Sequence, residues 1–197
     1  MTAPSEEVVI LVDEEGHALG TTPKATVHHR STPLHLAFSC YVLDPEGRLL
    51  VTRRALHKPT WPGVWTNTVC GHPAPGEQLA DAVRRRATQE LGMELEDVQL
   101  TLPAFRYEAT MANGVRENEL CPVFTAVSSS PALPDPEEVD DAVWIPWTSF
   151  RDSVLAGERD VSPWCVDQVR QLAALELPEG GFRAAGEDLL PPAARVP

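Results

Sequence analysis

The positions of apolar residues along the chain predict a protein built largely from short strands. Apolar runs at Val8–Val12, 35–43 and Arg48–Arg54 each end in residues that favour turns, which is typical of strands. The turn sequence Asp-Pro-Glu-Gly at 44–47 separates the second run from the third. These two runs are therefore expected to pair as a hairpin.

Two longer apolar segments follow, at 98–109 and 115–127, and the polar sequence Ala-Asn-Gly at 112–114 lies between them. This arrangement predicts a second hairpin. The proline-rich, acidic stretch at 128–141 has no periodicity. It indicates an exposed connection that leads into a short strand at 142–146.

Helical spacing is clearest at 76–91, and Gly92 after it is a natural stop. The apolar residues at four-residue spacing are Leu79, Val83, Ala87 and Leu91. Two closing helices are expected at 148–156 and 163–174. The second of them has Ser162 as a cap and a proline in its first turn.

A length of 197 residues with 43% apolar content suits one domain, which we expect over residues 1–177. The Gly-, Pro- and Ala-rich stretch at 178–197 contains little that could pack. We expect it to be a loosely ordered tail.

The net charge of −13 argues against a general nucleic-acid binder, because a phosphate backbone requires a cationic face. No window approaches the roughly 18 apolar residues of a membrane helix, and the start MTAPSEE lacks the layout of a signal peptide. We therefore expect a cytoplasmic protein that acts without membrane or nucleic acid. In an acidic chain, the basic residues at 53–54 and 84–86 favour a small polyanionic ligand.

The stretch 61–73, WPGVWTNTVCGHP, carries the strongest chemical signal. Cys70 and His72 are two residues apart, so an extended segment points both side chains to the same face. The four cysteines of the chain form no C-x-x-C pair, which argues against a zinc finger or a thioredoxin-like site. A buried free thiol is the ordinary alternative for each cysteine.

Several polar residues have spacings that suit a shared site. Glu117 and Glu119 are at i and i+2 on a strand, Arg86 and Glu90 are at i and i+4 on the predicted helix, and Arg53 and Arg54 end a strand on opposite faces. Three of the six histidines, at 28, 35 and 72, are candidates, and the first two lie in a segment at 23–35 that predicts a loop entering a strand. A surface ion pair, a solvated strand face and loop histidines are the alternatives.

The five candidate metal ligands are His28, His35, His72, Glu117 and Glu119. Five nitrogen and oxygen donors form a near-octahedral site with one opening, which suits Mn²⁺, Mg²⁺ or an unusual Zn²⁺ better than a tetrahedral structural zinc.

Three runs carry a resemblance to type 1 isopentenyl-diphosphate isomerase over roughly residues 8 to 170: TPLHLAFSCYVLD, LLVTRRALHKPTWPGVWTNTVCGHP and FRYEATMANGVRENELCPVF. The resemblance implies an α/β (α+β) fold, a Nudix-like α/β/α sandwich with a mixed sheet. It aligns residues 71–93 with the box G-x5-E-x7-R-E-U-x-E-E-x-G-U of the Nudix hydrolases. Arg86 and Gln89 stand where that box has glutamates, which weakens the hydrolase interpretation.

The resemblance also assigns roles to individual residues. It makes Cys70 and Glu119 the acid/base pair, with Tyr107 as a further catalytic candidate and Trp164 as a neighbouring aromatic residue of the substrate pocket. His28, His35, His72, Glu117 and Glu119 would hold the first metal, and Glu90 would hold a second ion, a Mg²⁺ that bridges to the diphosphate. The residues that would neutralise the diphosphate are Lys24, Arg54, Lys58 and Arg86.

The resulting hypothesis is an isomerase that interconverts isopentenyl diphosphate and dimethylallyl diphosphate through a tertiary carbocation. The π face of Trp164 would stabilise such a cation by about 2 kcal/mol, and Trp61 and Trp65 would form walls. Whether Cys70 or Glu119 gives the first proton stays open. A Nudix-type hydrolase and a non-catalytic, metal-stabilised binding module are the alternatives, and we expect a monomer or a weak homodimer.

Overall fold

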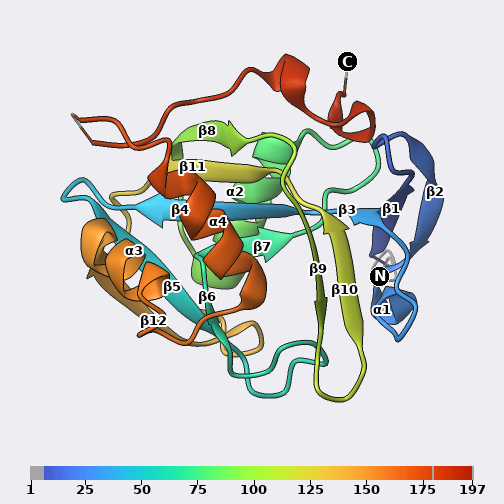
Figure 1. The fold of residues 1–197 in the computed structure, drawn as a ribbon, viewed down its shortest axis with the longest axis horizontal. Helices are drawn as coiled ribbons and strands as arrows, with labels where there is room; N and C mark the ends of the chain where they lie inside the picture. Colours follow the sequence, from blue (N-terminus) through green and yellow to red (C-terminus); the bar gives the residue numbers. More distant parts are fainter. Residues whose placement is uncertain (1–6, 179, 197) are drawn as a thin grey trace, which may run out of the picture.

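The computed structural model describes residues 7–178 and 180–196, which form two sheets with helices on both sides (Figure 1). The strands and helices, in chain order, are β1 (Val8–Val12), β2 (Ala18–Pro23), α1 (Lys24–Val27), β3 (His35–Leu36), β4 (Phe38–Leu43), β5 (Arg48–Arg54), β6 (Trp65–Thr66), β7 (Val69–Gly71), α2 (Leu79–Leu91), β8 (Glu96–Leu102), β9 (Arg106–Thr110), β10 (Arg116–Leu120), β11 (Val123–Val127), β12 (Val139–Pro146), α3 (Trp147–Leu155), α4 (Pro163–Ala173), and the 3-10 turns η1 (Glu187–Leu189) and η2 (Pro192–Ala194). None of the described helices has the length and apolar content of a membrane span.

The chain passes between the two sheets at two adjacent points. The five-stranded sheet has the order β2-β1-β3-β10-β9, and the seven-stranded sheet has the order β12-β5-β4-β11-β8 with β6 on β5 and β7 on β4. The chain leaves β3 and enters β4 through Ala37, and it leaves β10 and enters β11 through 121–122. Since β3 pairs with β10 and β4 pairs with β11, both in parallel, the two crossings lie side by side. We call this junction, at Ala37 and 121–122, the seam.

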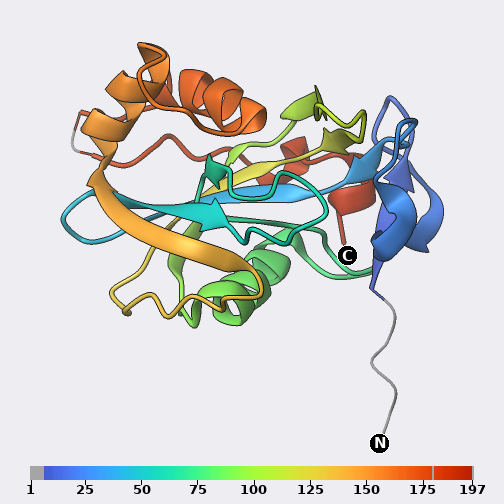
Figure 2. The same ribbon diagram turned by 90° about the horizontal axis from the view of Figure 1, so that it is seen from below.

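Helices cover both faces of the seven-stranded sheet, with α3 and α4 on one face and α2 on the other (Figure 2). The alternation along β4 explains this arrangement, because successive side chains point to opposite faces of a strand. Phe38, Cys40 and Val42 pack in the cluster with α2, whereas Tyr41 packs in the cluster with α3 and α4. Burying a large apolar side chain contributes about 1.5–3 kcal/mol, so both faces stabilise the sandwich. The α/β/α sandwich with mixed strands is therefore confirmed.

The helix predictions are confirmed with small shifts of their ends. Helix α2 begins at Leu79 rather than at 76, because Gly76 has a φ of 79° and the chain still turns there. It stops at Gly92, whose φ of 61° and N–H bonds to the last turn form a left-handed cap. Ser162 caps α4 by accepting from the N–H of Cys165.

The predicted strands at 35–43, 98–109 and 115–127 were each too long, since each is divided between the two sheets. The apolar pattern continues through the seam because both sheets are covered, so periodicity alone does not show the change of sheet. The second hairpin is confirmed across both sheets, by the antiparallel pairs of β9 with β10 and β8 with β11. In the first hairpin, the two strands pair directly only at Leu43 and Leu49. Beyond that pair Thr68 lies between the strands, where its hydroxyl accepts from the N–H of Val42 and donates to the carbonyl of Leu50.

Three connections differ from the predictions. The segment expected to be a loop contains the single helical turn α1, and β12 begins at Val139, inside the stretch predicted to be exposed. The tail was expected to be loosely ordered, yet residues 180–196 pack along the molecule, and the N–H groups of Ala185 and Ala193 bond to the carbonyls of Leu100 and Gly16. Leu190 is buried there. Backbone hydrogen bonds and the buried side chains of Phe182, Leu190 and Ala194 order this segment, which its composition does not reveal.

Candidate active site

A cavity of about 420 Å³ opens beside the seam, between the ends of the strands, α1, α2 and α4. All the sequence-predicted site residues except His35 line it: Lys24, His28, Arg54, Lys58, Cys70, His72, Arg86, Glu90, Tyr107, Glu117, Glu119 and Trp164. Segments that are far apart in the sequence therefore contribute to one enclosed space. Such a cavity, apolar with a few convergent polar groups, is typical of a small-molecule site.

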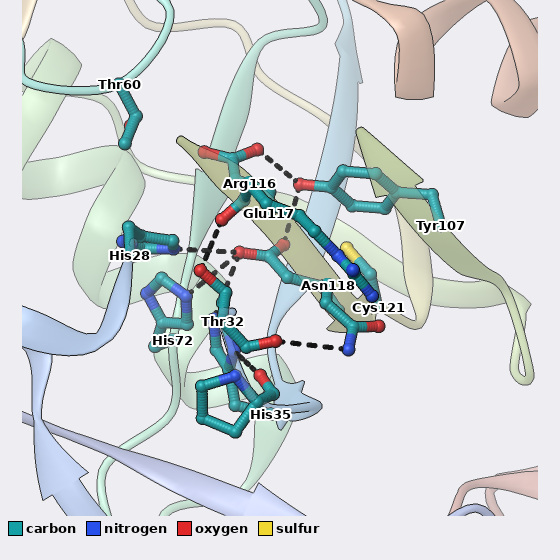
Figure 3. Close-up of polar contacts among 12 residues, drawn as sticks. His28, Thr32, His35, Thr60, His72, Tyr107, Arg116, Glu117, Asn118 and Cys121 are labelled. Carbon is teal, nitrogen blue, oxygen red and sulfur yellow. Dashed lines mark hydrogen bonds and ion pairs between the residues drawn. The ribbon is translucent and has the colours of Figure 1, made fainter. Parts of the chain in front are cut away.

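Three imidazoles and one carboxylate converge at the seam (Figure 3). The register explains part of this convergence, because Glu119 of β10 pairs directly with His35 of β3. Oε1 of Glu119 lies 3.2 Å from Nε2 of His72, 3.4 Å from Nε2 of His35 and 3.8 Å from Nε2 of His28. The four candidate ligand atoms lie within 4.8 Å of one another.

The histidine nitrogens at this centre have the chemistry of metal ligands. Nδ1 of His35 lies 2.9 Å from the carbonyl of Pro33 and donates to it, so Nε2 turns its lone pair towards the centre. Nε2 of His28 and Nε2 of His35 are buried and have no hydrogen-bond partner among the described residues. Neutral imidazoles with a carboxylate are a common donor set for divalent metals. The His28, His35, His72 and Glu119 cluster could therefore hold a metal ion.

Burial and the shared carboxylate set the proton affinities of this cluster. Burial lowers the pKa of His72 to about 4, which keeps its ring neutral. Burial also opposes charge on His35, but the neighbouring carboxylate of Glu119 outweighs it and raises the pKa of His35. Burial acts to raise the pKa of Glu119, yet the three histidines around Oε1 hold it well below its usual range. Glu119 is thus an ionised carboxylate in a buried site.

Glu117 lies on the same strand face as Glu119, as predicted, but its carboxylate is held differently. The hydroxyl of Tyr107 lies 2.9 Å from Oε2 of Glu117 and 2.9 Å from Oε2 of Glu119, and it can donate to one of them at a time. Burial and the charge of Glu119 raise the pKa of Glu117. Burial and the two carboxylates also raise the pKa of Tyr107 well above its usual value, so its hydroxyl keeps its proton.

Cys70 and His72 both line the cavity, as their two-residue spacing predicted. Cys70 is in β7, paired with Ser39 of β4, and its Sγ lies 3.4 Å from Oγ of Ser39 and 3.3 Å from Oδ1 of Asn67. Burial raises the pKa of Cys70 to about 11, so the group is a thiol at neutral pH. A protonated thiol next to an apolar cavity has a proton to give.

Aromatic rings close the cavity opposite the charged groups. Trp164 of α4 is 2% exposed, and its ring centroid lies 5.4 Å from that of Tyr107 and 5.5 Å from that of Trp61. Trp61, which was expected to be a wall, packs behind Trp164 and is not itself among the residues that line the cavity. Trp65, which was also expected to be a wall, lies under the guanidinium of Arg53 and not among the residues that line the cavity.

The far end of the cavity carries cations, each already paired with an acceptor. Lys24 Nζ lies 2.6 Å from Glu7 Oε2, and Lys58 forms an ion pair with Glu138. Arg54 donates to the carbonyl of Thr60 at 3.0 and 3.2 Å. The sequence left open which arginine of the pair at 53–54 faces the site, and Arg54 is the one that lines the cavity.

Helix α2 supplies one further cation and one carboxylate to this end. Arg86 and Glu90, one helical turn apart, form a buried ion pair. The guanidinium of Arg86 also lies near a second carboxylate, with its Nη2 at 3.4 Å from Oε2 of Glu138. The alternative of a surface ion pair is therefore wrong, because Arg86 is 7% and Glu90 is 8% exposed. Burial raises the pKa of Glu90. Its carboxylate lines the cavity, where the guanidinium of Arg86 favours the charged form against the effect of burial.

Sequence reasoning missed several groups that support these residues. Asn67 and Ser39 are fully buried and contact Cys70, and Glu138 lies between Lys58 and Arg86. Glu138 is in the stretch predicted to be exposed, where its charge resembles that of its acidic neighbours. The asparagine in TNTVCGHP stands three residues before Cys70, and this position within the motif was the one available signal.

Comparison with known proteins gives consistent results. The family model described as NUDIX domain matches residues 33–165. A protein of Saccharopolyspora erythraea named isopentenyl-diphosphate Delta-isomerase is 53% identical over 190 residues, covering 96% of this chain and 98% of the relative. Proteins of the same name from Clavibacter michiganensis and Rhizobium rhizogenes are 53% identical over 97% of this chain and 50% identical over 100% of it, and each match covers 96% of the relative.

Solved structures share the fold at low sequence identity. A Deinococcus radiodurans protein superposes with a TM-score of 0.63 at 18% identity, covering 84% of this chain and 98% of its own. A MutT NUDIX hydrolase from Burkholderia pseudomallei superposes with a TM-score of 0.53 at 20% identity, covering 71% and 98%. At this level of identity, the similarity shows the fold alone.

Proposed function

Because this chain belongs to the isopentenyl-diphosphate Delta-isomerases, enzymes with a Nudix domain, we propose that Cys70 and Glu119 exchange the protons of its reaction. The enzyme interconverts isopentenyl diphosphate and dimethylallyl diphosphate. The observation that supports the assignment is that a half-buried thiol and a buried carboxylate line one cavity together with the aromatic wall of Trp164. Tyr107 links this carboxylate to Glu117.

The reaction requires one proton to be added to a carbon and another to be removed two bonds away. Protonation of the terminal alkene carbon forms a tertiary cation, and loss of a proton from the carbon on its other side forms the internal double bond. Cys70 and Glu119 would each give or accept one of these protons, so one turnover leaves the donor one proton short and the acceptor with one proton more. Proton exchange with solvent would then restore the starting protonation of both groups. The buried π face of Trp164 would stabilise the cation by about 2 kcal/mol while keeping water away.

The His28, His35, His72 and Glu119 cluster would hold a divalent metal, Mn²⁺, Mg²⁺ or Zn²⁺, with Glu117 as a fifth donor. When bound, this ion would fix the carboxylate of Glu119 and lower its affinity for a proton. Tyr107 supports Glu117 and Glu119 from the other side, since its hydroxyl reaches both carboxylates at 2.9 Å.

The charged end of the cavity would bind the diphosphate. Positive charge comes from Lys24, Arg54, Lys58 and Arg86, which all line the cavity, and Glu90 would hold a Mg²⁺ that helps to neutralise the diphosphate. The substrate would thus be anchored by its anionic end while its alkene reaches the thiol. Gln89 and Arg86 replace two glutamates of the hydrolase box, which favours keeping the diphosphate intact.

The test is proton exchange in D₂O with Mg²⁺ and Mn²⁺ present. Isopentenyl diphosphate should gain deuterium in both substrate and product without releasing phosphate. Phosphate release without exchange would instead indicate the hydrolase, and binding with neither outcome would indicate the binding module. Removing the metals with a chelator should abolish exchange and lower the melting temperature, and adding metal back should restore both.

A further inference from the structure

Asn67 lies between β6 and β7 and is 0% exposed. Its Nδ2 donates to the carbonyl of Cys40 at 3.1 Å and to the carbonyl of Val69 at 2.9 Å. Both carbonyls accept only, so the amide must present its NH₂ group to them. Its oxygen, Oδ1, is therefore turned towards the cavity in a fixed orientation.

Three donors surround this oxygen. Oδ1 lies 3.3 Å from Sγ of Cys70, 3.2 Å from Nε1 of Trp164 and 2.9 Å from Oγ1 of Thr66. An amide oxygen has two lone pairs, so the three donors compete. Thr66 has another partner, Oγ of Ser162 at 2.8 Å, and can donate there. Oδ1 is then shared by the thiol and the indole.

We infer that Asn67 is a positioning residue that fixes the Cys70 thiol and the Trp164 ring relative to each other. The inference rests on the proposed function, in which Cys70 exchanges a proton and Trp164 faces the cation. One rigid oxygen bonded to both groups holds the thiol and the aromatic wall on one side of the cavity. Asn67 itself exchanges no proton, because a neutral amide oxygen only accepts hydrogen bonds.

The alternative is that Asn67 only stabilises the fold, by satisfying two carbonyls at the ends of buried strands. The two roles depend on different atoms, since Nδ2 serves the backbone and Oδ1 serves Cys70 and Trp164. Thr68 provides a matched control. It is 1% exposed and bonds to Val42 and Leu50 of the neighbouring strands, but it has no hydrogen bond with Cys70 or Trp164 among the described residues.

The experiment compares Asn67→Ala with Thr68→Val. In Asn67→Ala we expect kcat to fall about 10²-fold with KM nearly unchanged, because misplacement of a reacting group by about 1 Å costs this much and the diphosphate contacts lie elsewhere. Thr68→Val should lower the melting temperature and leave kcat close to that of the unchanged enzyme. Equal kcat losses in both variants, or an unchanged kcat in Asn67→Ala, would overturn the inference.

A measurement on the unchanged protein covers the case in which Asn67→Ala does not fold. The infrared S–H stretch of Cys70, obtained by subtracting the spectrum of Cys70→Ala, should lie at the lower frequency of a hydrogen-bonded thiol. In folded Asn67→Ala it should move towards the frequency of a free thiol, and a free-thiol band in the unchanged protein would contradict the inference. Ser39 is the other neighbour of the thiol, so a bonded band that persists in folded Asn67→Ala would assign the bond to Ser39 and overturn the inference. If the band shifts as expected but the unchanged protein shows neither isomerisation nor exchange, the proposed function fails, while the contact with Asn67 stands.

Discussion

The two ends of the cavity are built on different principles. At the seam, strand register sets the positions of the groups proposed to react: Glu119 pairs with His35 and with Tyr107, and Cys70 pairs with Ser39. At the far end, long side chains from α1, α2 and the loop after β5 form ion pairs. Backbone pairing fixes atoms closely, whereas long charged side chains can exchange partners. The first end suits proton transfer, and the second suits an anion that arrives and leaves.

The two ends of the cavity also differ in charge. At the seam, Cys70 and Tyr107 keep their protons at neutral pH because burial raises the pKa of each, and Glu119 is the ionised group. Lys24, Lys58 and Arg86 are charged but balanced by carboxylates. A change at the first end should therefore affect mainly kcat, and a change at the second should affect mainly KM.

The largest effect is expected from Cys70→Ala. Removing one proton donor should reduce kcat by about 10⁴-fold, the upper range for general acid–base catalysis, while the KM for substrate stays nearly constant. The measurement is turnover together with deuterium exchange, and circular dichroism serves as the control for folding. Activity within tenfold of the unchanged enzyme would show that the thiol is structural.

The next effect separates two neighbouring arginines on β5. Arg54→Met should raise KM by about 10²-fold with a smaller change in kcat, because loss of a buried charge contact costs about 2–5 kcal/mol. Arg53→Met is the matched control, since Arg53 pairs with Asp140 and lies over Trp65, outside the cavity. Similar KM values in both variants would contradict the assignment of the diphosphate end.

A smaller effect tests the carboxylate that balances the cations. Glu138 pairs with Lys58 and lies near Arg86, so it competes with an incoming anion. Glu138→Gln should bind metal-free inorganic diphosphate roughly tenfold more tightly, because one repulsive charge is lost. Isothermal titration calorimetry measures this, with Glu137→Gln as the control for an exposed neighbour. Weaker binding in Glu138→Gln would mean that the carboxylate holds the cations in place.

The smallest effect is expected on the free energy of unfolding, with both ends of the cavity unchanged. Glu77 accepts from Arg85 at 2.7 Å, and Arg85 also donates to the carbonyl of His72 at 3.2 Å. The hydrogen bond from Arg85 lowers the pKa of Glu77, so its stabilisation is complete above about pH 4.5 and is lost as the pH falls through the lowered value. Glu77→Gln should reduce the free energy of unfolding by about 1–2 kcal/mol at pH 7. This difference should shrink in acid, and a constant difference across pH would contradict the ion pair.

Local patterns in the sequence predicted the elements well, because helix α2 and its stop at Gly92 depend on residues close in the chain. The division of strands at the seam could not be predicted, since Leu36, Ala37 and Phe38 continue an apolar run without a turn signal. Ordering of the tail depends on contacts between Leu190 and distant residues. These contacts join residues that are far apart in the chain, so the local pattern of one sequence does not predict them.

The site residues divide in the same way. Strand alternation predicted that the side chains of Cys70 and His72 share one face, and that those of Glu117 and Glu119 do too. Asn67 and Glu138 were missed because their roles arise from neighbours brought together by folding. An amide or an acid has no periodic signature when its partners lie on other elements.

The seam also has a mechanical consequence. At two points the chain runs from a strand of one sheet into a strand of the other, and His35 and Glu119 each lie one residue before the end of the strand that precedes the crossing. An ion held by both residues would link these two segments at the seam, where the chain crosses between the sheets. Loading the centre should then stiffen the whole sandwich, so amide hydrogen exchange should slow in β4 and β11 as well as in the strands that bear the ligands.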